Sequence, residues 1–274
     1  MRRIFPAALA LATVITLAFL VVPIAAIFLR VSPATLVDAL GSEVARDALV
    51  VTVQTTLIAQ LLIILFGTPT AYLLATRRFP GHTLAVTLVE LPLVLPPAVA
   101  GIGLLATFGR LGLLGSSLSA LGIEIAFTKV AVVLAVMFVA GPFYVRTGIA
   151  AFGEVDASLT DAARTLGAGP ARTFGRIALP LALSGLGAGA ALSFARGIGE
   201  FGATIMFAGS LQGVTQTLSL AVYEQFDVDF DTALAIGAEL VVVSAAVLIV
   251  VKLVPSWRLS TSIFPTGSAT SASS

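Results

Sequence analysis

The chain has 274 residues, of which 58% are hydrophobic and 11% are charged, and its mean hydropathy is +1.08. An ordinary soluble domain is about 45–50% apolar and about 25% charged, so this composition argues against a soluble enzyme and against a disordered chain. Cysteine is absent and His82 is the single histidine, which excludes disulfides, zinc–thiolate sites and iron–sulfur clusters. No metal site is expected, and a net charge of +1 gives no reason to expect nucleic acid as a partner. The sequence therefore predicts an all-α, polytopic membrane protein in contact with a lipid bilayer.

The first apolar run, residues 4–29, follows a short basic start and carries no charge. The apolar region of a signal peptide is only about 7–15 residues long, so we interpret this longer run as an uncleaved transmembrane helix. Five further spans are expected at about 48–76, 83–108, 125–148, 181–206 and 233–254. The predicted organisation is a first helix with an outer loop over 1–47, a core over 48–255, and a flexible tail over 256–274.

The distribution of Lys and Arg predicts the orientation of these six transmembrane helices. With the N-terminus inside, the inner segments hold Arg2, Arg3, Arg77, Arg78, Arg146, Arg164, Arg172, Arg176, Lys252 and Arg258. The outer segments hold only Arg30, Arg46, Arg110 and Lys129, while acidic residues concentrate there. Both termini, and with them the tail, are therefore expected on the cytoplasmic side of a multi-pass membrane protein.

One inner loop, at about 149–180, is much longer than the others. Residues 154–166 combine good helix formers with an apolar repeat at helical spacing, which predicts a helix. Gly167 suits the helix C-cap, and Gly169-Pro170 marks a break before a second short helix with Phe174 and Ile177 on one face. Pro180 then opens the fifth span. This pattern is also typical of a simple interfacial linker.

The spacing Asp161-Ala162-Ala163, three residues, Gly167, nine residues, Ile177-x-Leu179-Pro180 resembles the E-A-A loop of ABC-importer permeases. The first position departs from that pattern, because Asp stands where the family has Glu. The resemblance implies a type I ABC-importer permease fold and a coupling helix that docks on a separate ATP-hydrolysing subunit. Its implied residues are Glu154, Leu159, Asp161, Ala162, Ala163, Arg164, Leu166, Gly167, Arg172, Phe174, Ile177 and Pro180. Leu159, Leu166 and Phe174 are expected to be buried against that subunit.

The sequence lacks the Gly-Lys pair of a Walker A loop, since its lysines follow Thr128 and Val251. ATP-driven transport would therefore need a partner that binds ATP and magnesium. The chain itself is expected to hold no cofactor and to be a transport subunit, not an enzyme.

Charges and prolines inside the spans form a second set of candidates, because each charge at bilayer depth costs about 2.5–3.5 kcal/mol on insertion scales. Arg196 and Glu200 are four residues apart on the fifth span, which predicts either an internal ion pair or part of a gate. Three prolines after Glu90 predict a kink in the third span. Glu239 is expected in a buried hydrogen bond, and His82 in a solvated loop.

Segments 91–97, 108–112, 193–204, 206–209 and 213–218 resemble the molybdate branch of the oxyanion permeases, whose tungstate and sulfate branches share much of the pattern. The resemblance implies a homodimer in the cytoplasmic (inner) membrane, two ATP-binding subunits and an extracytoplasmic oxyanion-binding protein. It implies molybdate import by alternating access, with tungstate or sulfate/thiosulfate as the alternative cargo. The candidates for the pathway or gate are Glu90, Pro92, Pro96, Pro97, Arg196, Glu200, Phe201 and Thr204.

Two other functions compete with this hypothesis. An ion-driven secondary transporter would use carboxylates such as Glu90, Glu200 and Glu239 as proton carriers, but two matching halves are not visible in the sequence. An intramembrane enzyme would need a nucleophile paired with a base, and the single histidine is expected at the rim of the membrane.

Overall fold

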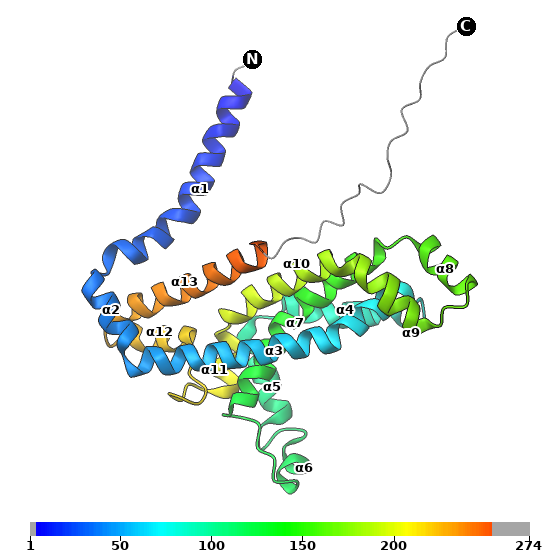
Figure 1. The fold of residues 1–274 in the computed structure, drawn as a ribbon. Coiled ribbons are helices and arrows are strands. Elements are labelled where there is room, and N and C mark those ends of the chain that lie inside the picture. The colour runs from blue at the N-terminus through cyan, green and yellow to red at the C-terminus, as the bar shows by residue number, and fades with distance from the viewer. Residues whose placement is uncertain (1–3, 254–274) are drawn as a thin grey trace.

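The computed structural model describes residues 4–253, and within them it consists of helices and connecting segments. The long helices are α1 (Ile4–Arg30), α3 (Glu43–Thr76), α7 (Lys129–Gly153), α10 (Leu179–Ile198) and α13 (Phe230–Leu253). Short helices connect them: α2 (Pro33–Gly41), α4 (His82–Val94), α5 (Pro97–Phe108), α6 (Gly115–Ala120), α8 (Ala157–Thr165), α9 (Pro170–Thr173), the π-helix η1 (Phe174–Ala178), α11 (Gly202–Ala208) and α12 (Leu218–Phe226). Figure 1 shows an elongated bundle with α8 and α9 at one end and α2 and α12 at the other. The predicted tail at 256–274 lies outside the described residues.

Five helices in the described part are long and apolar enough to cross a membrane, and α4 with α5 makes a sixth if this bent pair is counted as one. The axes of α4 and α5 differ by 115° across Leu95 and Pro96. The sequence predicted a kink in the third span, and the prolines do break the helix there because Pro96 and Pro97 cannot donate backbone hydrogen bonds. The change of direction is far larger than a kink, so residues 83–108 are two helices and not one straight span.

The fifth span also differs from its prediction. Residues 170–198 form one continuous helical run through α9, η1 and α10, so the span begins earlier than residue 181. It ends at Ile198, because residues 199–201 are not helical and α11 follows as a separate helix. The residues predicted at the outer end of one long helix, from Glu200 to Thr204, therefore lie in a break and in the first turn of the next helix.

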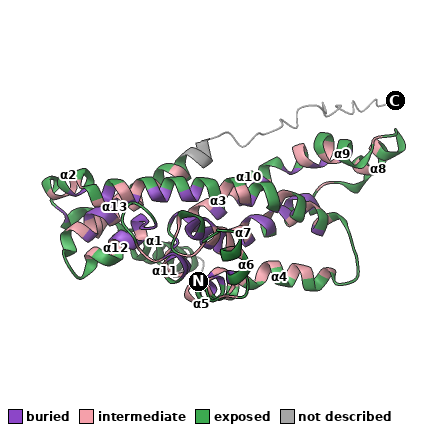
Figure 2. Cartoon of the chain, turned by 90° about the horizontal axis from the view of Figure 1, so that it is seen from below, coloured by how far each residue is buried: buried purple, intermediate pink, exposed green. Residues whose placement is uncertain are grey.

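The core is formed where α3 and α10 pack on α7, and half of the apolar stretch of α7 is buried. Glycines permit this close packing: a Cβ on Gly148 would lie 2.8 Å from the Cβ of Ala71, and one on Gly185 would lie 2.5 Å from the Cβ of Ala151. The small-residue pattern of α10 thus marks its packing face against α7. Figure 2 shows the buried residues gathered along α3, α7 and α10.

We expect Gly185→Ala to destabilise the protein by about 1–3 kcal/mol, because overpacking of a tight core costs about this much. The matched control is Gly187→Ala on the same helix, since a Cβ there would have no heavy atom within 4 Å. Removing a helical glycine should make the control more stable by up to about 1 kcal/mol. Thermal unfolding of both detergent-solubilised variants checks the difference, and equal midpoints would contradict the packing described here.

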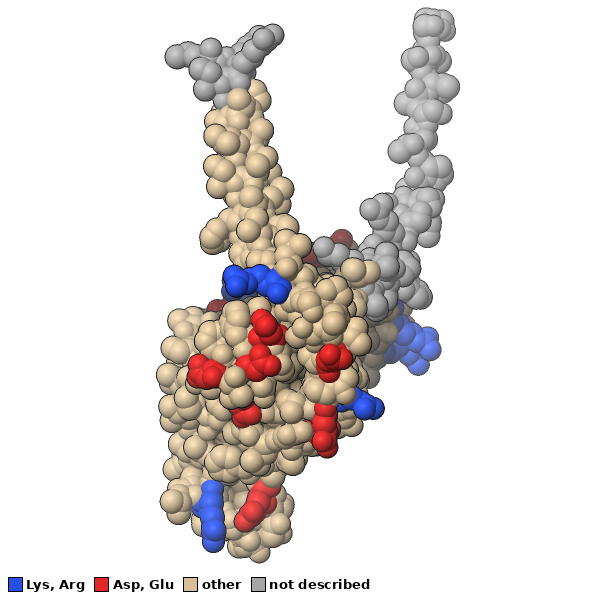
Figure 3. Space-filling model, turned by 90° about the vertical axis from the view of Figure 1, so that its left-hand side faces the viewer, with Lys and Arg blue, Asp and Glu red and all other residues tan. Residues whose placement is uncertain are grey.

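The first helix stands apart from this core. The apolar stretch of α1 has none of its residues buried, and the helix leads away from the bundle after contacting α13 at its base (Figure 1). At the same end of the molecule, acidic side chains predominate around α2, the start of α3 and the α12–α13 connection, as Figure 3 shows. These are the acidic residues that the sequence analysis assigned to the outer side, and they lie at the end opposite α8.

Candidate functional site

The segment predicted to couple the chain to an ATPase is built around α8. Asp156 caps this helix, because its Oδ1 atom accepts a hydrogen bond of 2.8 Å from the backbone N–H of Ser158. The same bond lowers the pKa of Asp156 below its ordinary value, since it stabilises the charged carboxylate. The helix therefore starts at Ala157, three residues later than predicted, and Glu154 instead caps the end of α7.

A sharp turn follows α8, as the sequence predicted. Gly167 has φ = +82°, in the left-handed region that favours glycine. Pro170 occupies the first position of α9, and Pro180 lies in the first turn of α10. From Pro170 to Ile198 the chain is one helical run of 29 residues, about 42 Å long at about 1.5 Å per residue. The α8 segment is thus joined to the middle of the molecule by a single stiff element.

The helix α8 has no buried residue, so its apolar side chains are at least partly exposed. Leu159 and Leu166 are 48% and 88% exposed, and Ala162 and Arg172 are also exposed. Asp161 forms an exposed ion pair of 2.9 Å with Arg164 on the same helix. The exposed residues include most of those that the resemblance implies in docking, and they remain accessible to another protein.

Phe174 is an exception to the docking prediction. Its ring lies 4.7 Å from that of Tyr72 and 6.1 Å from that of Phe152, between ring centroids. It is half-buried against the ends of α3 and α7, while Ile177 is also partly buried. Phe174 therefore packs the α9–η1 run against this chain's own core. The sequence periodicity predicted that Phe174 lies on an apolar helix face, but periodicity does not determine which surface packs against that face.

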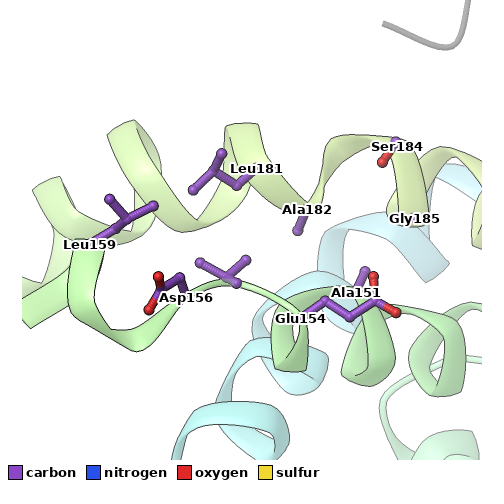
Figure 4. A pocket seen from close by; sticks show the side chains of 9 residues that line it. Ala151, Glu154, Asp156, Leu159, Leu181, Ala182, Ser184 and Gly185 are labelled. Atoms are coloured by element: carbon purple, nitrogen blue, oxygen red, sulfur yellow. The ribbon is translucent and has the colours of Figure 1, made fainter. Parts of the chain in front are cut away.

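A cavity of about 280 Å³ separates α8 from the start of α10. Figure 4 shows Asp156 and Leu159 on one side of it, with Leu181 and Ala182 of α10 on the other. The helix α8 is therefore connected to the body mainly through its two ends and is not packed along its length.

The other predicted pair lies at the far end of the same helical run. Nη2 of Arg196 is 2.7 Å from Oε2 of Glu200, which confirms that these two residues pair. The Glu200 side chain is 1% exposed and that of Arg196 is 29% exposed. The second carboxylate oxygen, Oε1, accepts a hydrogen bond of 2.8 Å from the backbone N–H of Ala203 in α11. Glu200 thus connects the last turn of α10 to the first turn of α11 across the break at Gly199.

The helix α11 packs closely on α5, which begins directly after the proline break. A Cβ on Gly202 would lie 2.9 Å from the Cβ of Pro97, and one on Gly101 would lie 2.5 Å from the carbonyl oxygen of Ala203. The two backbones are therefore in direct contact, so α5 and α11 form one unit, which we call the α5–α11 plate. Among the remaining gate candidates, Phe201 stacks on Tyr223, Thr204 is fully buried in the plate, and Pro92 and Pro96 flank the bend before it.

The structure also places Glu90, Glu239 and His82. Glu90 is paired across helices, with its Oε1 atom 3.5 Å from Nε of Arg146 on α7, a partner that the sequence analysis had counted with the inner loops. Oε2 of Glu239 is buried but has no hydrogen-bond partner among the described residues, so the expected hydrogen bond is not found for this atom. His82 starts α4 and is partly buried, with Nε2 lying 2.8 Å from the carbonyl oxygen of Leu74, so it is not a solvated loop residue.

Residues 63–257 match the model of a protein family, which is described as "Binding-protein-dependent transport system inner membrane component". The chain belongs to this family. It is therefore a transport component and not an enzyme, and its family works with a binding protein.

This chain aligns with most of the length of several curated relatives. The "Molybdenum transport system permease protein ModB" of Mycobacterium bovis is 44% identical over 84% of this chain and 88% of the relative. The protein of the same name from Escherichia coli K12 is 39% identical over 77% of this chain and 92% of the relative. A "Probable sulfate transport system permease protein cysT" of Nephroselmis olivacea is 32% identical over 92% and 90%. The resemblance to the oxyanion permeases is confirmed.

Solved structures confirm the fold. A bacterial ABC transporter involved in import of the polysaccharide alginate matches with a TM-score of 0.72 at 19% identity, over 94% of this chain and 97% of that chain. The MetNI methionine ABC transporter matches with a TM-score of 0.60 at 19% identity, over 76% and 93%. The chain has the type I ABC-importer permease fold predicted from the E-A-A-like loop.

Proposed function

We propose that this chain is the membrane-spanning subunit of an ATP-driven importer that carries molybdate into the cell. Support for the cargo comes from the names of its relatives and from the oxyanion-permease motifs at 91–97 and 193–218. The sulfate-named relatives make tungstate or sulfate/thiosulfate the alternative cargo.

The observation that carries the mechanism is the continuous helix from Pro170 to Ile198. One end of it is attached to the exposed α8, and the other end meets the α5–α11 plate through Glu200. Movement of α8 on a docked ATPase would therefore pass through the turn at 166–169 and then along this one helical run to the plate. In this account α8 and its flanking turns, from Glu154 to Pro180, are the coupling helix, and the plate with the Arg196–Glu200 pair is the gate.

The proposed assembly holds two copies of this chain, two cytoplasmic ATP-binding subunits and an extracytoplasmic oxyanion-binding protein, in the cytoplasmic (inner) membrane. One six-helix chain supplies half of the pathway, and a two-fold homodimer is the common symmetric solution. ATP and magnesium would be bound by the ATPase alone. Both termini and α8 would lie on the cytoplasmic side, in agreement with the excess of Lys and Arg in the α8-side segments.

Uptake of labelled molybdate, tungstate and sulfate in cells lacking this chain tests the cargo. We expect loss of molybdate uptake at nanomolar concentration, restored by the wild-type chain, with sulfate uptake unchanged. Loss of sulfate uptake with intact molybdate uptake would contradict the molybdate assignment and favour the alternative cargo.

A further inference from the structure

The Glu90–Arg146 pair lies in an unusual place for two charges. Glu90 is eight residues after the start of α4, and Arg146 is seven residues before the end of α7. At about 1.5 Å per residue these positions are about 12 Å and about 10 Å inside the α8 end of the bundle. Yet the side chain of Glu90 is 42% exposed and that of Arg146 is 68% exposed in the single chain.

Lipid is a poor neighbour for this pair, because each charge in hydrocarbon costs about 2.5–3.5 kcal/mol even on insertion scales. A dry interface with a second copy is also unfavourable, since desolvating two charges costs more than a single 3.5 Å contact returns. An arginine near a helix end can extend to the headgroups, but this one is turned sideways toward Glu90. Water is the neighbour that fits both charges.

The residues around the pair support an aqueous face. On α4, Thr83 and Thr87 precede Glu90 at helical spacing and form one polar stripe, and both threonines are exposed. The leucines at 84, 88 and 91 are centred about 100° round the same helix from this stripe and are 63%, 58% and 48% exposed. The helix α4 is thus two-sided, with a lipid-type face of leucines and a polar face that carries Glu90.

The same contrast holds on the neighbouring helices. Next to Arg146 on α7 the exposed residue is Ala150, while Thr147 and Ala151 on the adjacent face contact α10. On α10 three small exposed residues, Ser184, Gly187 and Ala188, lie near this level, between the exposed Leu183 and Leu192. The exposed face of α3, by contrast, carries large apolar side chains such as Leu57, Leu61, Leu65 and Phe66.

We propose that this face, formed by the polar side of α4, Arg146 and Ala150 of α7 and the small residues of α10, lines a water-filled inner section of the transport pathway. Arg146 is its contact for the tetrahedral oxyanion. The inference rests on the proposed function and deepens it by placing a cargo-contacting residue.

The chemistry of the pair suits a conduit. The ion pair with Glu90 uses Nε of Arg146. Within the described residues, Nη1 and Nη2 are not part of this pair and can donate to an anion. The planar guanidinium group suits the spacing of the oxygens of such an anion. Glu90 keeps the local net charge near zero, so the attraction for an oxyanion stays weak. A pathway needs this weakness, because its cargo must leave as readily as it enters.

The absence of native cysteine makes the proposal directly testable. Ala150→Cys is introduced into the full importer complex, and open membrane fragments are treated with anionic and cationic methanethiosulfonate reagents. We expect reaction with both reagents at similar rates, because Arg146 and Glu90 nearly cancel each other's charge. Adding Arg146→Gln should lower the anionic-to-cationic rate ratio at least about threefold, through loss of the local positive potential. The further change Glu90→Gln should return the ratio toward one.

The matched control is Leu61→Cys, which is 68% exposed on the apolar face of α3 and should not react with either charged reagent. If Ala150→Cys is equally unreactive, the face is covered by lipid or by a second copy, and the proposal is wrong. An anionic-to-cationic rate ratio that does not change in Arg146→Gln would also contradict the proposal. The labelling does not depend on cargo, so a failure of molybdate uptake in the wild type would count against the proposed function alone.

Discussion

Replacing Glu200 with alanine is expected to reduce oxyanion uptake more than tenfold while the protein still reaches the membrane. The substitution removes both contacts by which Glu200 joins α10 to the α5–α11 plate: the ion pair with Arg196 and the hydrogen bond from Ala203. Loss of a helix-capping acceptor alone costs about 1 kcal/mol. Glu200→Gln should retain an intermediate rate, because its amide oxygen still accepts the bond from Ala203. Uptake by the two variants, normalised to protein in the membrane, is the measurement.

The burial of the two partners predicts an asymmetry in stability. Arg196→Gln leaves the almost fully buried Glu200 carboxylate without its counter-charge, whereas Glu200→Gln leaves a part-exposed Arg196 that solvent can reach. Removing one partner of a buried pair costs about 3–5 kcal/mol, and this cost should fall mainly on Arg196→Gln. The double variant Arg196→Gln/Glu200→Gln should be more stable than Arg196→Gln alone. Additive losses in thermal unfolding would contradict a buried pair.

Asp161→Arg is expected to prevent the ATPase subunits from co-purifying with the permease. Asp161 is exposed on α8, the element that the proposed function places against the ATPase. The change puts a positive charge beside Arg164 on that surface and leaves the fold intact, because no residue of α8 is buried. Asp161→Asn, which removes the charge without reversing it, should give a smaller loss.

The control for an added arginine is Ser117→Arg, at an exposed position of α6 outside the segment 154–180, which should leave co-purification of the ATPase near the wild-type level. Pull-down of the ATPase from detergent-solubilised membranes measures the effect. Normal recovery of the ATPase with Asp161→Arg, together with normal uptake, would show that this face of α8 is not the docking surface.

Local patterns in the sequence were sufficient for much of the fold. The apolar runs predicted the long helices. Gly167 and Pro170 marked the turn after α8, because glycine reaches a positive φ without strain and proline fixes its own φ at a helix start. The i, i+4 spacing of Arg196 and Glu200 predicted their contact. These features depend on residues close together in the chain.

Features that depend on distant parts of the chain could not be predicted in the same way. Residues 199–201 contain no proline, and the helix ends there because Glu200 caps α11, which packs on α5 about a hundred residues earlier. The partner of Glu90 lies on another helix, and Phe174 turns toward Tyr72 of α3. The angle of 115° between α4 and α5 likewise depends on the contact of α5 with α11.

The energy source of transport is the central claim, since an ion-driven carrier could also use membrane carboxylates such as Glu239. The measurement is molybdate uptake into proteoliposomes that hold this chain with its ATPase, with the binding protein outside and ATP inside. The account predicts uptake that requires ATP and the ATPase subunit and that persists when ionophores collapse the proton and sodium gradients. Uptake by the permease alone, independent of ATP and abolished by ionophores, would contradict it.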